Sequence, residues 1–356
     1  MKRIWLSGCR GNAAASRVAL LTGDVLYRSS VMAVGGRAGH VLADIYAADP
    51  MAPLRPAPEA STVLAKAAGA YEGAAAALAA PWARFVQGSG EAQLVRLRGP
   101  LRSGYVLRLG GDRAFTLSRV SLGTPRVVTG FATSRGPRRS NEDSVLVASL
   151  RVCPQGPRLH IVLLADGAGG LSYGQMASML GVVETHGYIA RSLPEGGSLE
   201  RSLLEAIRHA SRRVLEEARK LGKMAASTIA AYIVDEGNRV IAYGNAGDST
   251  VHLVREGRVE ELSRLHRHAA GEGRAPLTSY LGLPEPRVET GLLRGLRGRL
   301  HLVAMSDGVH EYVEEREIAE IVASSSPGRA AWRLVSLAAS RGSRDNMTAV
   351  VTLVKW

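Results

Sequence analysis

Cysteine and lysine are scarce in this chain of 356 residues. The only cysteines, Cys9 and Cys153, lie far apart, which excludes a disulfide framework and the closely spaced cysteines of a zinc ribbon. Only five of the 45 basic residues are lysines. A genome-wide codon preference for arginine explains this bias better than nucleic-acid binding does, although the net charge of +13 favours anionic partners in general. We therefore do not expect nucleic acid as a partner.

Long apolar segments are also missing, and we do not expect a leader sequence. No window approaches the ~18 apolar residues that a membrane-spanning helix needs. The stretch "LSGC" at 6–9 looks like a lipoprotein cleavage box, but residues 4–6 are the only apolar segment before it, where a secretion signal needs about 7–15 residues. We expect a cytoplasmic protein with two reduced thiols and no membrane partner.

Glycine motifs that bind nucleotides are absent as well. The pattern G-x-x-x-x-G-K-[ST] does not occur, and "GAGGLSYG" at 167–174 lacks the G-x-G-x-x-G spacing. A kinase or a nucleoside triphosphatase is therefore disfavoured.

The chain divides into two regions that differ in their sequence patterns. Three prolines at 52–59 indicate an exposed loop, an Ala-rich segment from Ala60 to Leu78 favours a helix, and residues 92–120 are typical of one or two hairpins. No chemical motif occurs in this part. We predict an N-terminal extension or small domain over 1–122, of unknown role and uncertain fold, and a second domain over 123–356.

The second region contains more strand patterns than helix patterns. Several strands follow one another directly, and residues 235–238 and 255–257 are hairpin turns between such neighbours. Apolar residues at helical spacing predict a helix over 199–221, with Ser198 as the N-cap and Gly222 as the stop. Further helices are expected at 173–193, 315–323 and 328–340. This pattern favours an α+β fold of antiparallel sheets with helices packed outside.

Acidic side chains recur where apolar strands end. A single Asp-Gly or Asp-Asn is equally well explained as an ordinary turn. Several carboxylates in one place, however, would repel one another and become protonated unless a cation were bound. Oxygen-only ligands suit Mg²⁺ or Mn²⁺, and two such ions can activate a water for attack on phosphorus. The acidic residues are Glu142, Asp143, Asp166, Asp248, Asp307 and Asp345.

Six short motifs, taken in their order along the chain, resemble those of the metal-dependent type-2C (PPM) protein serine/threonine phosphatases, and in particular of the prokaryotic members. Each motif is weak alone, but the complete ordered set over 125–355 is specific. The resemblance implies a four-layer α-β-β-α sandwich of two antiparallel sheets, with a centre of two Mn²⁺ or Mg²⁺ ions at one end. The motifs are R-x-x-N-E-D-S (138–144), A-D-G-x-G-G (165–170), S-T (227–228), G-D-S (247–249), S-D-G (306–308) and D-N-x-T (345–348).

The same resemblance implies how the metals would be held. Asp166 would bridge both ions, and the carbonyl of Gly167 would bind one of them. Asp307 and Asp345 would complete the ligands of the other ion. Glu142 and Asp143 would hold metal-bound waters or the second ion.

The implied reaction is hydrolysis of phosphoserine and phosphothreonine. Arg138 would clamp the phosphate, and a metal-bound hydroxide would attack phosphorus, so no phospho-enzyme forms. Asp166 and Asp307 complete the catalytic set. Asp248 would support the sheet end, and Asn346 would support the ligands. The partners implied are a phosphorylated protein substrate and a cognate protein kinase.

The sequence departs from the family pattern at three places. Ala168 stands where eukaryotic members often carry a histidine that protonates the leaving group. Residues 219–228 lack the aspartate associated with a third metal, so a third ion is not expected. The segment between Asp248 and Asp307 is short. Its loop at 264–283 carries His266 and His268, which could contact phosphate but are expected to be solvated.

Two other functions are compatible with parts of the sequence. "GLSYG" at 170–174 matches the nucleophile elbow of a serine α/β-hydrolase, with Ser172 as nucleophile. The strand ends near Asp166, too early for such an elbow, and the sheet pattern is antiparallel. The other alternative is a non-catalytic module that binds phosphoproteins on the same fold. The intact set of carboxylates argues against it.

Overall fold

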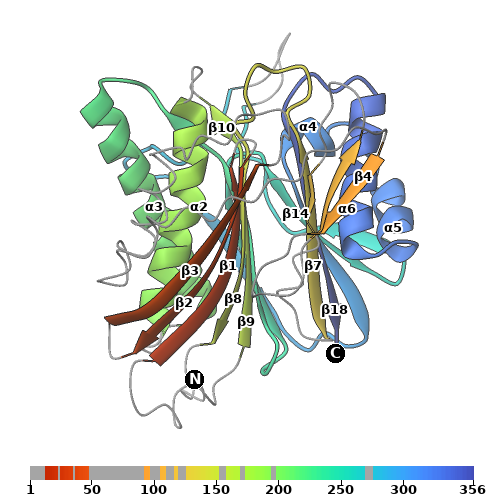
Figure 1. Ribbon diagram of the computed structural model, residues 1–356, viewed down its shortest axis with the longest axis horizontal. Coiled ribbons are helices and arrows are strands. Elements are labelled where there is room, and N and C mark those ends of the chain that lie inside the picture. The colour runs from red at the N-terminus through yellow and green to blue at the C-terminus, as the bar shows by residue number, and fades with distance from the viewer. Residues whose placement is uncertain are drawn as a thin grey trace.

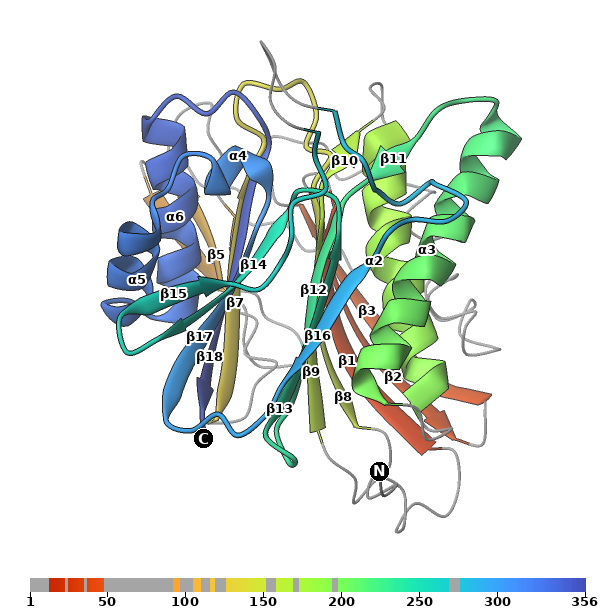
Figure 2. The same cartoon turned by 180° about the vertical axis from the view of Figure 1, so that it is seen from behind.

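Two antiparallel sheets packed face to face form the centre of the protein (Figure 1). The computed structural model describes residues 13–22, 25–34, 37–47, 92–96, 105–109, 116–118, 126–151, 158–168, 173–193, 198–268 and 276–356. Helices cover the outer face of each sheet in both views (Figures 1 and 2). The four layers follow the order helix, sheet, sheet, helix, which confirms the expected α+β sandwich.

The first sheet has eight strands in the order β16-β13-β12-β9-β8-β1-β2-β3. All its neighbouring strands are antiparallel. Its strands are β1 (Ala13–Thr22), β2 (Val25–Val34), β3 (Arg37–Ala47), β8 (Ser144–Arg151), β9 (Arg158–Ala165), β12 (Ile229–Asp235), β13 (Val240–Ala246) and β16 (Glu289–Leu293).

The second sheet has six strands in the order β15-β14-β17-β18-β7-β6, also antiparallel. Two short two-stranded ladders, β10-β11 and β4-β5, complete the strands. The bounds are β4 (Ala92–Arg96), β5 (Tyr105–Leu109), β6 (Thr116–Ser118), β7 (Val127–Ser134), β10 (Gly167–Ala168), β11 (Ala226–Ser227), β14 (Thr250–Arg255), β15 (Arg258–Glu261), β17 (Arg299–Met305) and β18 (Met347–Lys355).

Helices α2 (Tyr173–Ser192) and α3 (Leu199–Leu221) cover the first sheet, whereas α5 (Glu315–Ala323) and α6 (Pro327–Ser340) cover the second (Figure 2). The one-turn helix α4 (Asp307–His310) follows β17. The bounds of α3 match the prediction because both end signals are local. Ser198 accepts a hydrogen bond from the backbone N–H of Arg201, and Gly222 adopts the left-handed conformation at φ 61°.

Strand β12 shows how the layers share one core. Ala230, Tyr232 and Val234 pack between the two sheets, while the alternate residues of the strand pack against α2 and α3. Both faces are buried, which explains the continuous apolar run in the sequence. The hydroxyl of Tyr232 bonds to Oγ1 of Thr352 at 2.7 Å, and Thr352 bonds to Thr129 at 2.8 Å, so a polar link crosses the core.

The N-terminal strands adjoin the strands of the second region. Strand β1 pairs with β8, with Thr22 opposite Ser144, and β6 pairs with β7. The predicted division into 1–122 and 123–356 stays a prediction, and the helix predicted at Ala60–Leu78 lies outside the described residues. Of the helices that the structure describes, none combines the length and apolar character needed to cross a membrane.

Candidate metal centre

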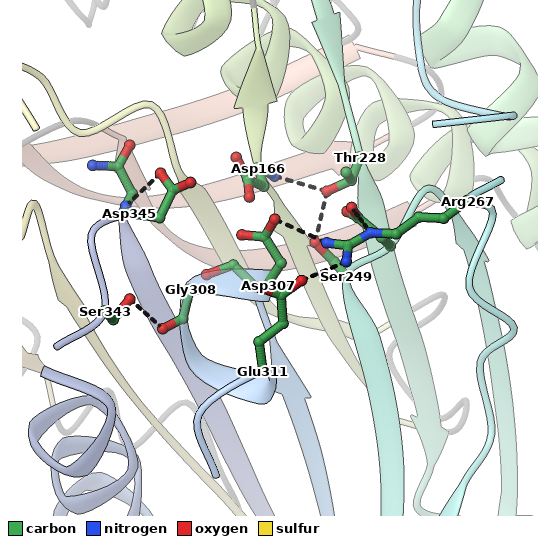
Figure 3. Close-up of polar contacts among 12 residues, drawn as sticks. Asp166, Thr228, Ser249, Arg267, Asp307, Gly308, Glu311, Ser343 and Asp345 are labelled. Carbon is green, nitrogen blue, oxygen red and sulfur yellow. Dashed lines mark hydrogen bonds and ion pairs between the residues drawn. The ribbon is translucent and has the colours of Figure 1, made fainter. Parts of the chain in front are cut away.

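Asp166 lies at the end of β9 and is fastened to the start of β12. Its backbone N–H donates to Oγ1 of Thr228 at 3.0 Å, and the N–H of Thr228 donates to the Asp166 carbonyl at 2.8 Å. Oγ1 of Thr228 also bonds to Oγ of Ser249 at 2.7 Å, which brings in the turn before β14 (Figure 3). Three strand ends therefore fix the backbone that carries the Asp166 carboxylate.

Gly167 and Gly174 are required by close backbone approach. A Cβ at Gly167 would lie 2.0 Å from the carbonyl oxygen of Gly174 and 2.8 Å from that of Glu142. A Cβ at Gly174 would lie 2.2 Å from Oε2 of Glu142. Because Gly167 and Gly174 have no side chain, α2 and the segment before β8 can pack closely against the end of β9.

Asp307 and Asp345 come from the second sheet, at the end of β17 and just before β18. Asp307 is 1% exposed. A Cβ at Gly308 would lie 2.1 Å from the Asn346 carbonyl oxygen and 3.2 Å from the Asp345 Cβ, so the two segments are in contact. Figure 3 shows Asp166, Asp307 and Asp345 approaching the same region from three strand ends.

Asp143 connects the two sheets close to these carboxylates. Its Oδ2 accepts hydrogen bonds from Oγ of Ser306 at 3.1 Å and from Oγ1 of Thr348 at 2.5 Å. Burial raises the pKa of Asp143 to about 7; the hydrogen bond of Thr348 opposes this shift, and the charge of Asp345 adds to it. Asp166 also acts on this pKa, so Asp143 is close to carboxylates from both sheets.

Glu142 lies beside Asp345 and Arg138. Burial raises the pKa of Glu142, with the hydrogen bond from Ser140 and the charge of Arg138 lowering it and Asp345 raising it. Asn346 supports this segment: its Oδ1 accepts from the N–H of Glu142 at 2.8 Å, and its Nδ2 donates to the Ser140 carbonyl at 2.9 Å.

Arg138 stands at the rim of the site. Its Nη2 donates to Oδ2 of Asp345 at 2.6 Å, and its Nε donates to the carbonyl of Arg344 at 3.1 Å. The side chain is 52% exposed. The predicted phosphate clamp therefore adjoins a predicted metal ligand and still faces solvent.

Arg267 is the site residue that sequence reasoning missed. It pairs with Asp248, with Oδ2 of Asp307 and with Glu311 (Figure 3). In the sequence, Arg267 is marked only as a basic residue in the short segment after β15, and no motif contains it. The neighbouring His266 is 3% exposed, which corrects the expectation that it is solvated. Its Nδ1 accepts from the backbone N–H of Gly247, whereas His268 is exposed as expected.

The donor set fits hard divalent cations. The predicted ligands are carboxylate and carbonyl oxygens, with no thiolate or imidazole among them, as Mg²⁺ and Mn²⁺ prefer. As the side chains stand, no three Asp, Glu, His or Cys residues in the described ranges are grouped to hold one ion. The carboxylates of Asp307 and Asp345 are instead bonded to arginines. Binding of metal would therefore require these ion pairs to rearrange or to share their oxygens.

The sheets of this protein do not match those of a serine α/β-hydrolase, the alternative raised by Ser172. Every strand pair in the described residues is antiparallel, whereas the nucleophile elbow belongs to an α/β sheet. Ser172 itself lies outside the described residues, immediately before α2.

Known proteins are similar to this chain in sequence and in fold. The chain is 29% identical over 229 residues to the serine/threonine protein phosphatase PstP of Mycobacterium tuberculosis; the match covers 60% of this chain and 42% of PstP. It thus spans less than half of that relative. PppA, a key regulatory component of T6SS in Pseudomonas aeruginosa, is 27% identical with a TM-score of 0.51, over 64% of this chain and 97% of that one.

A third similar structure is the catalytic domain of PstP in complex with two manganese ions. It is 23% identical with a TM-score of 0.52, over 65% of this chain and 99% of that one, and it supports the fold. The family model for protein phosphatase 2C matches residues 138–340, which is more than half of the chain. The chain therefore belongs to the protein phosphatase 2C family.

Proposed function

We propose that this protein is a metal-dependent protein serine/threonine phosphatase. The observation that carries the proposal is that Asp166, Asp307 and Asp345 approach one region from three strand ends (Figure 3). Arg138 lies beside them, paired with Asp345. Membership of the protein phosphatase 2C family supports the same activity. The full carboxylate set favours catalysis over a non-catalytic phosphoprotein-binding role.

Two divalent ions are proposed as the cofactors. Asp166 would lie between them, with Gly167 offering its carbonyl to one ion and Asp307 and Asp345 serving the other. Glu142 and Asp143, on the segment before β8, would hold coordinated waters. The bound ions would supply Lewis acidity and lower the pKa of a water molecule. The similar PstP structure contains manganese, which supports Mn²⁺, and Mg²⁺ remains the alternative ion.

Arg138 is proposed to bind the phosphate of the substrate. A planar guanidinium donates two parallel hydrogen bonds to phosphate oxygens. Because half of the side chain is exposed and its pair with Asp345 is at the surface, little free energy holds it in place. It can therefore exchange the Asp345 carboxylate for an incoming phosphate without leaving the rim.

The proposed substrate is a phosphorylated protein, and the kinase that phosphorylates it is a proposed partner. The similarity to PstP supports a phosphoserine or phosphothreonine substrate. A cytoplasmic location stays a prediction from the composition.

Hydrolysis of p-nitrophenyl phosphate by the full chain tests the proposal. We expect no turnover after chelation, recovery with Mn²⁺ or Mg²⁺, and loss of at least about 100-fold in kcat for Asp166→Asn. Ser172→Ala should keep full activity. Absence of turnover by the wild-type protein in Mn²⁺ and Mg²⁺, or full activity of Asp166→Asn, would overturn it.

A further inference from the structure

Arg267 joins three carboxylates at the edge of the proposed metal centre. Its Nε lies 2.5 Å from Oδ2 of Asp248, its Nη2 lies 3.1 Å from Oδ2 of Asp307, and its Nη1 contacts Glu311. The Arg267 side chain is only 17% exposed. Each edge of the guanidinium is therefore used, and one of its partners is a proposed metal ligand.

The segment that carries Arg267 is fastened to the turn between β13 and β14. The backbone N–H of His266 donates to the Gly247 carbonyl at 3.0 Å, and the N–H of Gly247 donates to Nδ1 of His266 at 3.1 Å. Nδ2 of Asn245 donates to the Arg264 carbonyl at 2.7 Å. On the other side of Arg267, the backbone N–H of His268 donates to the Pro276 carbonyl at 3.1 Å. Because the backbone is held on both sides of Arg267, its guanidinium is held beside Asp307.

Arg138 and Arg267 differ in how firmly they are held. Arg138 is 52% exposed and bonds to one carboxylate, Asp345. Arg267 is mostly buried and bonds to three, so displacing it would break three ion pairs at once. Arg138 is suited to exchange partners during turnover, whereas Arg267 is suited to stay.

We propose that Arg267 is a fixed counter-ion of Asp307 and that its charge weakens the binding of divalent metal at that carboxylate. The inference rests on the proposed function for the identity of the metal ligands. A unit positive charge next to a ligand repels an incoming divalent cation, and the guanidinium shares the same carboxylate. Arg267 touches neither substrate nor metal in this account; it is a positioning residue that sets the metal concentration at which the site fills.

The test measures Mn²⁺ binding to the full chain after a chelator has removed any bound metal. Calorimetry and thermal unfolding report the binding, and neither method depends on turnover. Arg267→Gln should bind Mn²⁺ on the order of tenfold more tightly than wild type, because a nearby positive charge is removed. Arg267→Lys keeps the charge and should stay close to wild type. Mn²⁺ should also raise the Tm of Arg267→Gln by more than it raises the wild-type Tm.

Arg213 provides a matched control. It also pairs with three carboxylates, Glu184, Glu216 and Glu217, but between α2 and α3. Arg213→Gln should lower the Tm equally with and without Mn²⁺ and leave the binding midpoint unchanged.

A further variant keeps the test decisive if Arg267→Gln does not fold. Glu311 is 38% exposed, and Glu311→Gln makes the surroundings of Asp307 more positive. This variant should bind Mn²⁺ a few-fold more weakly. Equal or weaker binding by Arg267→Gln, tightening in Arg267→Lys, or unchanged binding by Glu311→Gln would overturn the inference. Absence of Mn²⁺ binding by wild type would instead overturn the proposed function.

Discussion

Asp166 and Thr228 are tied together by two reciprocal hydrogen bonds. The N–H of Asp166 donates to Oγ1 of Thr228 at 3.0 Å, and the N–H of Thr228 donates to the Asp166 carbonyl at 2.8 Å. The side chain of Thr228 is 3% exposed, so water cannot replace it. The backbone of the proposed bridging ligand therefore depends on one buried hydroxyl.

Replacing Thr228 by Val should damage both stability and activity. The half-buried N–H of Asp166 and the buried hydroxyl of Ser249 would each lose a partner, which costs about 1–3 kcal/mol in the free energy of unfolding. We expect a lower kcat as well, because Asp166 would be less well fixed. Urea unfolding and Mn²⁺-dependent hydrolysis measure the two effects. Thr228→Ser keeps the hydroxyl and should stay near wild type; equal losses in both variants would contradict this account.

Adding one methyl group at Gly167 should disrupt the site. The new Cβ would lie 2.0 Å from the Gly174 carbonyl oxygen, a backbone atom that cannot move alone. We expect Gly167→Ala to lose nearly all hydrolysis and to bind Mn²⁺ more weakly. Gly257→Ala is the control: its Cβ has open space, and its φ of 75° costs only about 1 kcal/mol. Its activity should be unchanged, and similar kinetics for the two variants would argue against the close approach.

Arg138→Gln should act on substrate rather than on metal. Loss of the guanidinium removes two charge-assisted hydrogen bonds to phosphate, so kcat/KM should fall by at least about tenfold. The Mn²⁺ midpoint should move little, because the pair with Asp345 is exposed. Steady-state kinetics at saturating Mn²⁺ and calorimetric Mn²⁺ titration separate the two. If only the midpoint of the Mn²⁺ titration shifted, Arg138 would be assigned to metal binding rather than to substrate binding.

Acid should destabilise the protein through His252. Burial, with a smaller contribution from the charge of His310, lowers the pKa of His252 from 6.5 to about 4. Below pH 6.5, His252 binds a proton in the unfolded chain but stays neutral in the folded protein. The contribution of neutral His252 to the free energy of unfolding is therefore lost as the pH falls towards 4. From pH 6.5 to 5 it amounts to about 2 kcal/mol.

His252→Leu isolates this effect. Neither ring nitrogen of His252 has a hydrogen-bond partner in the described residues, so leucine should be tolerated. The wild-type free energy of unfolding should fall by about 2 kcal/mol more than that of His252→Leu between pH 6.5 and 5. Parallel pH profiles, measured by urea unfolding, would show that His252 is protonated in the folded state.

Local signals allowed the helices and hairpins to be predicted from the sequence. Helix α3 combines apolar spacing with Ser198 and Gly222 at its ends, and α5 (Glu315–Ala323) has the predicted bounds. Short motifs mark the candidate carboxylates in the sequence, and their role as metal ligands stays a prediction. Arg267 could not be found, because its partners lie 19 to 44 residues away and no motif contains it. His266 was misjudged for the same reason, since its burial comes from contact with Gly247.

Release of phosphate from a phosphothreonine peptide is the most direct test of the central claim. The full chain would be stripped of metal, assayed, and assayed again after addition of Mn²⁺, with Asp307→Asn treated in parallel. The account predicts no release without metal, multiple turnovers with Mn²⁺, and a loss of at least about 100-fold for Asp307→Asn. Turnover that survives chelation, or that Asp307→Asn retains in full, would contradict a metal centre built on these carboxylates.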